Sequence, residues 1–124
     1  MTKRVLDIGN CSADHAAIQR LIDNNFDAEV IRAHGLRDAK AALAGGGIDL
    51  VLVNRKLDID GSNGLDIITR IKRDAEFSAV PCMMITNFTD HQDRAVEAGA
   101  ERGFGKRELE QPETRERLAK FLAG

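Results

Sequence analysis

The stretch IDLVLVNRKLDIDGSNGLD, residues 48–66, decides how the rest of the chain is arranged. Its front half, residues 49–54, is a short apolar run with three glycines before it and a charged turn after it. Such a run is typical of a strand buried on both faces, as in the middle of a parallel sheet. In these sheets, ligands bind just beyond the carboxyl ends of the strands. The residue expected there is Asn54, and an asparagine has no anionic oxygen with which to act as a nucleophile.

Length and composition indicate a single soluble domain over residues 1–124. Its 43% hydrophobic and 31% charged residues are ordinary for a globular protein with one core. The net charge of −2 gives no reason to expect nucleic acid as a partner, and no apolar run approaches the ~18 residues of a membrane span. Residues 1–5 lack a signal-peptide pattern, and Cys11 and Cys82 fit no metal-binding spacing. We therefore expect a cytoplasmic protein with reduced thiols and with neither a membrane nor a nucleic acid as partner.

Short apolar runs alternate with amphipathic segments along the whole chain. The expected strands are residues 5–8, 28–33, 49–54, 80–86 and 102–105. Apolar residues at helical spacing predict five helices between and after them, the first capped by Ser12 and the last opened by Pro112. Such alternation indicates an α/β fold, a three-layer sandwich with a five-stranded parallel sheet and right-handed crossovers. The pattern alone leaves the order of the strands open.

Four segments carry the landmarks of a known family in the same order. The run RVLDIGNCSADHAAIQRLI matches its first strand and helix, and IDLVLV leads into its phosphoacceptor position, here Asn54. VPCMMIT ends in its switch hydroxyl, Thr86, and EAGAERGFGK ends in its active-site lysine, Lys106. Over its whole length the chain thus resembles the receiver domain of two-component response regulators. The resemblance implies a flavodoxin-like fold with strand order 2-1-3-4-5.

The departures from the family fall on the residues that carry its chemistry. A typical receiver holds Mg²⁺ with two adjacent acids after the first strand, where this chain has Gly9 and Asn10. The phosphoacceptor aspartate is replaced by Asn54. Mg²⁺ needs hard oxygen ligands that include carboxylates, so a pocket that keeps only Lys106 should be mildly cationic and should hold no metal. The resemblance therefore implies a degenerate receiver that is not an enzyme, has no catalytic residue or cofactor, and is not phosphorylated by the usual route.

In the family, the fourth helix, the last strand and the last helix usually bind partners and mediate self-association. Carried over, this face spans residues 89–124, and its glycine-containing strand is expected at the edge of the sheet. Gly103 replaces the family's switch aromatic, so the coupling from Thr86 to this face should be missing. We expect a protein partner here, with a homodimer through the same face as the alternative. The residues expected to contact the partner are Arg94, Glu97, Arg102 and Phe104.

Two other functions stay open for the loop DIDGS, residues 58–62. Asp58 or Asp60 can serve as a substitute phosphoacceptor, which would make the domain a receiver with non-standard phosphorylation. The loop also resembles the nucleophile loop of haloacid-dehalogenase-type phosphatases. However, polar residues 54–56 precede its first aspartate, and no later motif supplies metal-binding acids. The simplest interpretation is a solvated turn.

Several other polar residues have structural interpretations. Asp7 lies deeper in the first strand than the vacated acidic pair, so a partly buried carboxylate paired with a neighbour is expected. Lys106 either keeps a functional role or donates a hydrogen bond to the Asn54 carbonyl group, and we favour the hydrogen bond. Capture of a small anion near Ser12, at the start of the first helix, stays open. The histidines expected at the surface are His15, His34 and His91.

Overall fold

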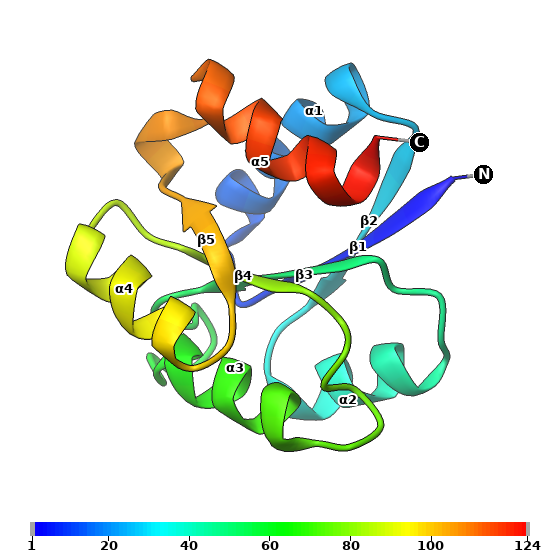
Figure 1. Ribbon diagram of the computed structural model, residues 1–124, viewed down its shortest axis with the longest axis vertical. Helices are drawn as coiled ribbons and strands as arrows, with labels where there is room; N and C mark the ends of the chain where they lie inside the picture. The colour runs from blue at the N-terminus through cyan, green and yellow to red at the C-terminus, as the bar shows by residue number, and fades with distance from the viewer. Residues whose placement is uncertain (1, 124) are drawn as a thin grey trace.

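The computed structural model describes residues 2–123, in which a sheet of five parallel strands forms the middle layer (Figure 1). The strands are β1 (Lys3–Ile8), β2 (Ala28–Ala33), β3 (Leu50–Asn54), β4 (Cys82–Ile85) and β5 (Glu101–Phe104). The helices are α1 (Ser12–Asn25), α2 (Leu36–Ala44), α3 (Gly64–Arg73), α4 (Thr89–Glu97) and α5 (Pro112–Leu122), with a short 3-10 helix η1 (Lys106–Glu108) before α5. The order across the sheet is β2-β1-β3-β4-β5. The predicted three-layer α/β fold with five helices and strand order 2-1-3-4-5 is confirmed.

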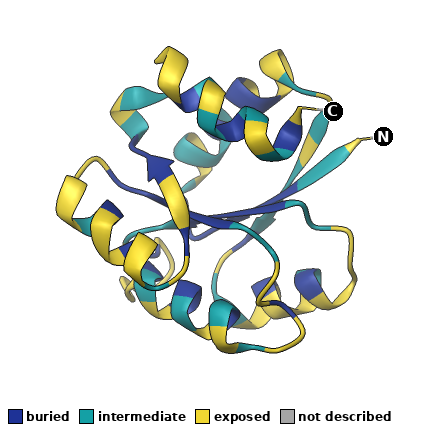
Figure 2. Cartoon of the chain, in the orientation of Figure 1, coloured by how far each residue is buried: buried dark blue, intermediate teal, exposed yellow. Residues whose placement is uncertain are grey.

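Different helices cover the two faces of the sheet (Figure 1). Helices α1 and α5 lie on one face, and α2, α3 and α4 lie on the other. The apolar side chains of β3 alternate between the two resulting cores. Leu50 and Leu52 pack with the α1 and α5 side, while Val51 and Val53 pack with the opposite side. All four are fully buried, which confirms the prediction of a central strand covered on both faces (Figure 2).

Several expected boundaries differ from the structure by one or two residues. Cys11, not Ser12, is the N-cap residue of α1 and makes no capping bond through its side chain. Ser12 is the first helical residue, and its hydroxyl accepts a hydrogen bond from Arg32 Nη1 at 3.2 Å. Strand β4 begins only at Cys82, since Pro81 has no N–H to donate to a neighbouring strand. Strand β5 begins and ends one residue earlier than expected.

The pairing of β4 with β5 is irregular. Met83 pairs with Glu101 and Ile85 pairs with Phe104, so β5 has one residue more than β4 between the two pairs. An extra residue of this kind is a bulge, which leaves backbone groups without their usual partners in the sheet.

The buried side chain of Gln92, on α4, supplies the missing partners. Its Nε2 donates to the carbonyl oxygen of Met84 at 2.9 Å, and its Oε1 accepts from the backbone N–H of Gly103 at 2.8 Å. The same Nε2 lies 3.3 Å from the carbonyl oxygen of Thr86. A Cβ atom at Gly103 would press against the Met84 carbonyl oxygen, so this close approach requires glycine. Gln92 thus joins β4 to β5 through a side-chain amide.

Replacing Gln92 with leucine tests this role. Gln92→Leu leaves buried backbone groups of Met84 and Gly103 without partners, and we expect a loss of about 2–4 kcal/mol in the free energy of unfolding. Urea denaturation measures the loss. The matched control is Gln19→Leu on the exposed side of α1, which should change stability by less than about 0.5 kcal/mol. Equal losses in the two variants would contradict the role assigned to Gln92.

Candidate functional site

The carboxyl ends of the central strands bring most of the predicted site residues together. Asn54 ends β3, Thr86 follows β4, and Lys106 begins η1 just after β5. They line one hollow of about 250 Å³. Gly9 lies at the end of β1 in contact with Asn54 but does not line the hollow. The full lining is Asn54, Arg55, Lys56, Ile85, Thr86, Asn87, Phe88 and Lys106.

The side-chain amide of Asn54 is bonded to two backbone carbonyl groups. Its Nδ2 donates to the carbonyl oxygen of Gly9 at 3.1 Å and to that of Lys56 at 2.7 Å. These bonds tie the end of β1 to the loop that follows β3. A carboxylate in the same orientation would place an oxygen against two carbonyl oxygens, and it has no hydrogen to donate when ionised. The local structure therefore favours asparagine over the aspartate of a working receiver.

Gly9 stands where the first acidic residue of a receiver would be, and Leu57 occupies the space beside it. Gly9 has a φ of 80°, a left-handed conformation that favours glycine. A Cβ atom at this position would collide with the end of the Leu57 side chain and would lie 3.3 Å from the Leu57 Cα. Leu57 is only 3% exposed, and the backbone N–H of Asp58 donates to the Gly9 carbonyl oxygen at 2.9 Å. The Leu57 side chain thus occupies the space that a Cβ atom at Gly9 would need.

Asn10, at the second acidic position, belongs to a buried polar network. Its Nδ2 donates to Asp7 Oδ1 at 2.6 Å, and Asp7 Oδ2 lies 2.7 Å from His15 Nδ1. Arg32 Nη2 donates to the Asn10 carbonyl oxygen at 3.2 Å. Asp7 is paired, as predicted, but is fully rather than partly buried. The surface position predicted for His15 is wrong, because its side chain is 15% exposed and faces this carboxylate; His34 is exposed, as predicted.

The sequence predicts a hydrogen bond from Lys106 to the Asn54 carbonyl group, but Lys106 has a different partner. Its Nζ instead forms an ion pair with Asp14 Oδ2 at 2.7 Å, because the first turn of α1 faces the end of β5. This hydrogen bond from Lys106 is the main cause that holds the pKa of Asp14 below its usual value. The thiol of Cys11 donates to the same carboxylate at 3.2 Å. The positive charge of Lys106 is thus already compensated, and the uncompensated charge of the hollow comes from Arg55 and Lys56.

Arg55 and Lys56 are site residues that the sequence interpretation missed. They follow Asn54 directly, where the sequence predicts only a charged turn. Their position immediately after a central strand is the signal that could have identified them, since that position faces the ligand-binding edge of a parallel sheet.

The hydroxyl group of Thr86 bonds within the loop between β4 and α4. Thr86 is buried, and its Oγ1 accepts a hydrogen bond from the backbone N–H of Phe88 at 3.3 Å. This short turn holds the start of α4 against the end of β4.

The loop after β3 is a compact turn. The N–H of Leu57 donates to the Ser62 carbonyl oxygen, and that of Gly61 donates to the Leu57 carbonyl oxygen. The Asp60 carboxylate accepts from the Ser62 N–H at 2.8 Å, and hydrogen bonds from Ser62 lower the pKa of Asp60. Asp58 and Asp60 are both exposed. Within residues 2–123, no group of three or more histidine, cysteine, aspartate or glutamate side chains is placed to hold a metal ion.

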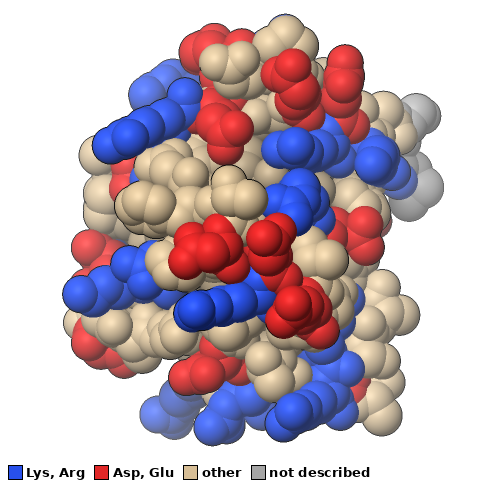
Figure 3. Space-filling model, turned by 60° about the vertical axis from the view of Figure 1, so that its left-hand side comes forward, with Lys and Arg blue, Asp and Glu red and all other residues tan. Residues whose placement is uncertain are grey.

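The face expected to bind a partner is largely exposed. Arg94, Glu97 and Arg102 lie at the surface, where Arg102 pairs with Asp93. Phe104 is the exception, because it is fully buried between the sheet and the layer of α1 and α5. The prediction that Phe104 contacts a partner is therefore wrong. An edge strand has one free edge, but helices still cover its faces. Figure 3 shows acidic and basic side chains interspersed over this side of the molecule.

Over residues 2–123, no helix has the length and apolar character needed to cross a membrane.

Solved structures with a similar fold include several response regulators. One from Thermotoga maritima has a TM-score of 0.79 and 24% identity, with all of both chains covered. The receiver domain of a DNA-binding response regulator from Colwellia psychrerythraea 34H has a TM-score of 0.78 and 23% identity, covering 95% of this chain and 96% of that one. A phosphorylated cyanobacterial phytochrome response regulator has a TM-score of 0.76 and 18% identity, covering 100% and 96%. The fold is that of a receiver domain. No protein-family model matches the sequence, and no curated protein matches it.

Adding one methyl group at Gly9 tests the packing of Leu57. We expect Gly9→Ala to lower the free energy of unfolding by about 2–4 kcal/mol, from overpacking together with a left-handed alanine. The matched control is Gly46→Ala, since Gly46 has a φ of 77° and nothing within 4 Å of the added carbon. The control should lose only about 1 kcal/mol. The double variant Gly9→Ala, Leu57→Ala should lose less than the sum of its single changes in urea denaturation, and strict additivity would contradict the contact.

Changing Asn54→Asp tests the two carbonyl contacts. We expect a loss of about 1–3 kcal/mol in the free energy of unfolding at neutral pH, because a carboxylate cannot replace the donated hydrogen bonds. The loss should shrink at acid pH, where a protonated carboxyl group can donate one of them. Asn63→Asp is the control, since Asn63 caps α3 by accepting from the Leu65 N–H, a role that aspartate fills equally well. An Asn54→Asp variant as stable as the control would refute this account.

Proposed function

We propose that this chain is a receiver-like signalling module that binds another protein and does not act through an aspartyl phosphate. On this proposal it catalyses no reaction, needs no cofactor and works in the cytoplasm. The observation that carries the proposal is the Leu57 side chain packed against Gly9.

Phosphorylation requires a bound metal ion and a nucleophile, and on this proposal the chain provides neither. Leu57 takes the volume of a metal-binding side chain at Gly9, and the Asn10 amide is turned toward Asp7 in the interior. Mg²⁺ would then have no carboxylate at either position. Asn54 supplies no nucleophile and is bonded to two backbone carbonyl groups. Restoring one aspartate would therefore leave the remaining requirements unmet.

The contacts between β4 and β5 support a domain that is held in one state. The Gln92 amide binds both strands, and the Thr86 hydroxyl is occupied by the Phe88 N–H. Gly103 offers no aromatic side chain that could change its position between two states. A switch needs two arrangements of similar free energy, and these contacts favour a single arrangement.

The exposed side of α4, β5 and α5 is the best candidate for the partner surface. Glu97 and Arg102 are exposed there, as is Val96 with 41% of its surface accessible. Arg102 also lines a hollow of about 260 Å³, together with Glu101, Lys120 and Phe121 among others. Charges of both signs beside apolar groups suit either a charged protein partner or a second copy in a two-fold arrangement.

Treatment with a phosphodonor tests the central claim. The chain is incubated with acetyl phosphate and Mg²⁺, and its intact mass is measured. We expect no added phosphoryl group on the native chain. The Asn54→Asp variant should likewise show no stable increase in mass. A stable adduct mapped to Asp58 or Asp60 would overturn the proposal in favour of non-standard phosphorylation. Hydrolysis of a generic phosphate ester that Asp58→Asn abolishes would instead indicate a phosphatase.

Capture of partners from the source cell tests the binding surface. Native chain should retain a partner without any phosphodonor, whereas the charge reversals Glu97→Arg and Arg102→Glu together should lose it. Arg37→Glu is the control, since Arg37 is an exposed residue of α2 and α2 lies apart from α4, β5 and α5 (Figure 1). Analytical ultracentrifugation of the same variants separates a second copy from a different partner. Equal loss in the Arg37→Glu control would contradict the assigned surface.

A further inference from the structure

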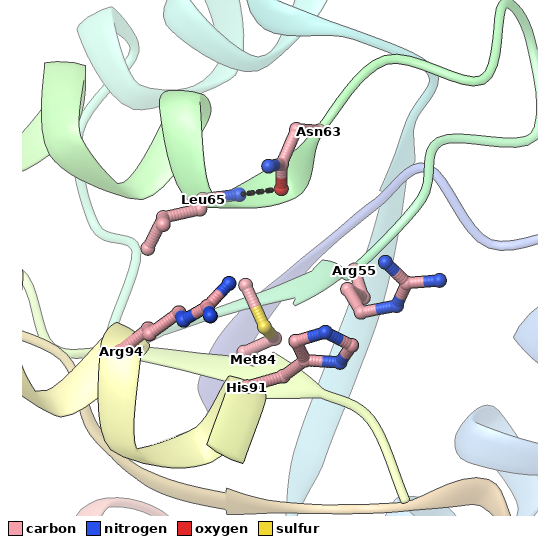
Figure 4. Close-up of a pocket in the computed structure, with 6 residues that line it drawn as sticks. All are labelled: Arg55, Asn63, Leu65, Met84, His91 and Arg94. Carbon is pink, nitrogen blue, oxygen red and sulfur yellow. Dashed lines mark hydrogen bonds between the residues drawn. The ribbon is translucent and has the colours of Figure 1, made fainter. Parts of the chain in front are cut away.

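A second cavity, of about 80 Å³, lies between the start of α3 and helix α4 (Figure 4). Arg55 comes from the end of β3, while His91 and Arg94 lie one turn apart on α4. Figure 4 shows Arg55 and Arg94 on opposite sides of the Met84 and His91 side chains. His91 is half-buried, so it is less exposed than the sequence predicts. The lining residues are Arg55, Asn63, Leu65, Met84, His91 and Arg94.

The cavity collects basic side chains without an acidic one. Neither Arg55 nor Arg94 forms an ion pair or a side-chain hydrogen bond with any residue in the part of the chain that the structure describes. By contrast, Arg4 and Arg102 each pair with a carboxylate. Nδ1 of His91 is buried and makes no hydrogen bond. An anion in this cavity would meet basic side chains with no carboxylate among the lining residues to oppose it.

This cavity adjoins the hollow at the end of β3, because Arg55 lines both. Lys56 adds a second uncompensated cation on the side of the hollow, where no carboxylate is among the lining residues. Phe88 lies between the two spaces: it lines the hollow and its ring meets that of His91 edge to face, with centroids 5.6 Å apart. Phe88 is 59% exposed, which is unusual for a large apolar ring.

We propose that the cavity and the hollow together bind a small phosphate monoester. The phosphoryl group lies in the cavity between Arg55, His91 and Arg94, and the rest of the molecule extends along the hollow against Phe88. Guanidinium groups suit this role because their planar N–H donors match the oxygens of a phosphoryl group in pairs. A cavity of about 80 Å³ is large enough for several waters or one small oxyanion.

The exposed Phe88 ring favours a nucleotide over a sugar phosphate. A planar base can stack on the ring, whereas a sugar offers no such surface. The site shares Arg94 with the face expected to bind a partner, but it does not include Glu97 or Arg102, whose charge reversals test that face. This proposal goes beyond the proposed function. Binding of a phosphate monoester would involve no covalent change at any residue, so it is compatible with a chain that does not accept phosphorus.

Titration of the whole chain followed by amide NMR tests the site. The probes are inorganic phosphate, a nucleoside monophosphate, a hexose phosphate and the unphosphorylated nucleoside. We expect saturable shifts near Arg55 and His91 with the first three probes and none with the nucleoside. The nucleoside monophosphate should bind most tightly, and added salt should weaken every phosphate probe.

Matched variants locate the binding. Arg55→Gln and Arg94→Gln should each weaken nucleotide binding about ten- to a hundredfold, the range of a charge-assisted hydrogen bond. Arg37→Gln, an exposed arginine on α2, should leave the affinity unchanged. Phe88→Ala should weaken binding of the nucleotide but not that of inorganic phosphate. Thermal denaturation of each variant verifies that it is folded.

Three results would overturn the proposal. The first is absence of saturable binding of any phosphate probe at millimolar concentration. The second is an equal loss in Arg37→Gln, which would indicate attraction to the overall surface charge. The third is equal affinity of hexose phosphate and nucleotide in the native chain, which would remove the role given to Phe88. None of these results bears on the partner surface, whose test uses different residues.

Discussion

The packing of Leu57 against Gly9 fixes the arrangement at the carboxyl ends of β1 and β3. Gly9 adopts a left-handed conformation that most residues take only at a cost of about 1–2 kcal/mol, and Leu57 fills the space that a side chain there would occupy. The Asp58 N–H and the Asn54 amide then both donate to the same Gly9 carbonyl oxygen. The loop after β3 is thus held over the end of β1. At this point the structure places the Leu57 side chain beside Gly9 and two hydrogen bonds on the Gly9 carbonyl oxygen.

The acidic side chains near the ends of β1 and β3 pair with other residues. Asp7 is buried with Asn10 and His15 in the interior, and Asp14 takes the charge of Lys106 at the start of α1. Neither acid is among the residues that line the hollow. Because no carboxylate faces Arg55 or Lys56 there, the sign of the site is opposite to that of a magnesium pocket. This outcome agrees with the cationic pocket expected from the sequence, although the charge comes from different residues.

The parts of the structure that depend on local pattern could be predicted, and the parts that depend on contacts between distant segments could not. The apolar run at residues 50–54 and the alternation of elements were sufficient for the fold class, while the strand order came from a resemblance. The glycines at positions 9 and 103 are visible in the sequence. Nothing there indicates that Leu57 fills the space beside Gly9 or that Gln92 accepts a hydrogen bond from Gly103. Phe104 was misplaced because the bulge in β5 changes the alternation of its side chains, so that residues 103 and 104 are both buried.

Helix α4 connects features that are otherwise separate. Its buried side carries Gln92, which joins β4 to β5, and its side toward α3 carries His91 and Arg94 at the cationic cavity. Its outer side carries Glu97 on the proposed partner surface. A ligand changes a protein only through its different affinities for two arrangements. A phosphoryl group held by His91 and Arg94 would contact α4 directly, so its binding free energy could favour one position of this helix without any chemistry at Asn54. Because Gln92 fixes the inner side of α4 to the sheet, the expected response is a local change along the helix and not a rearrangement of β4 and β5.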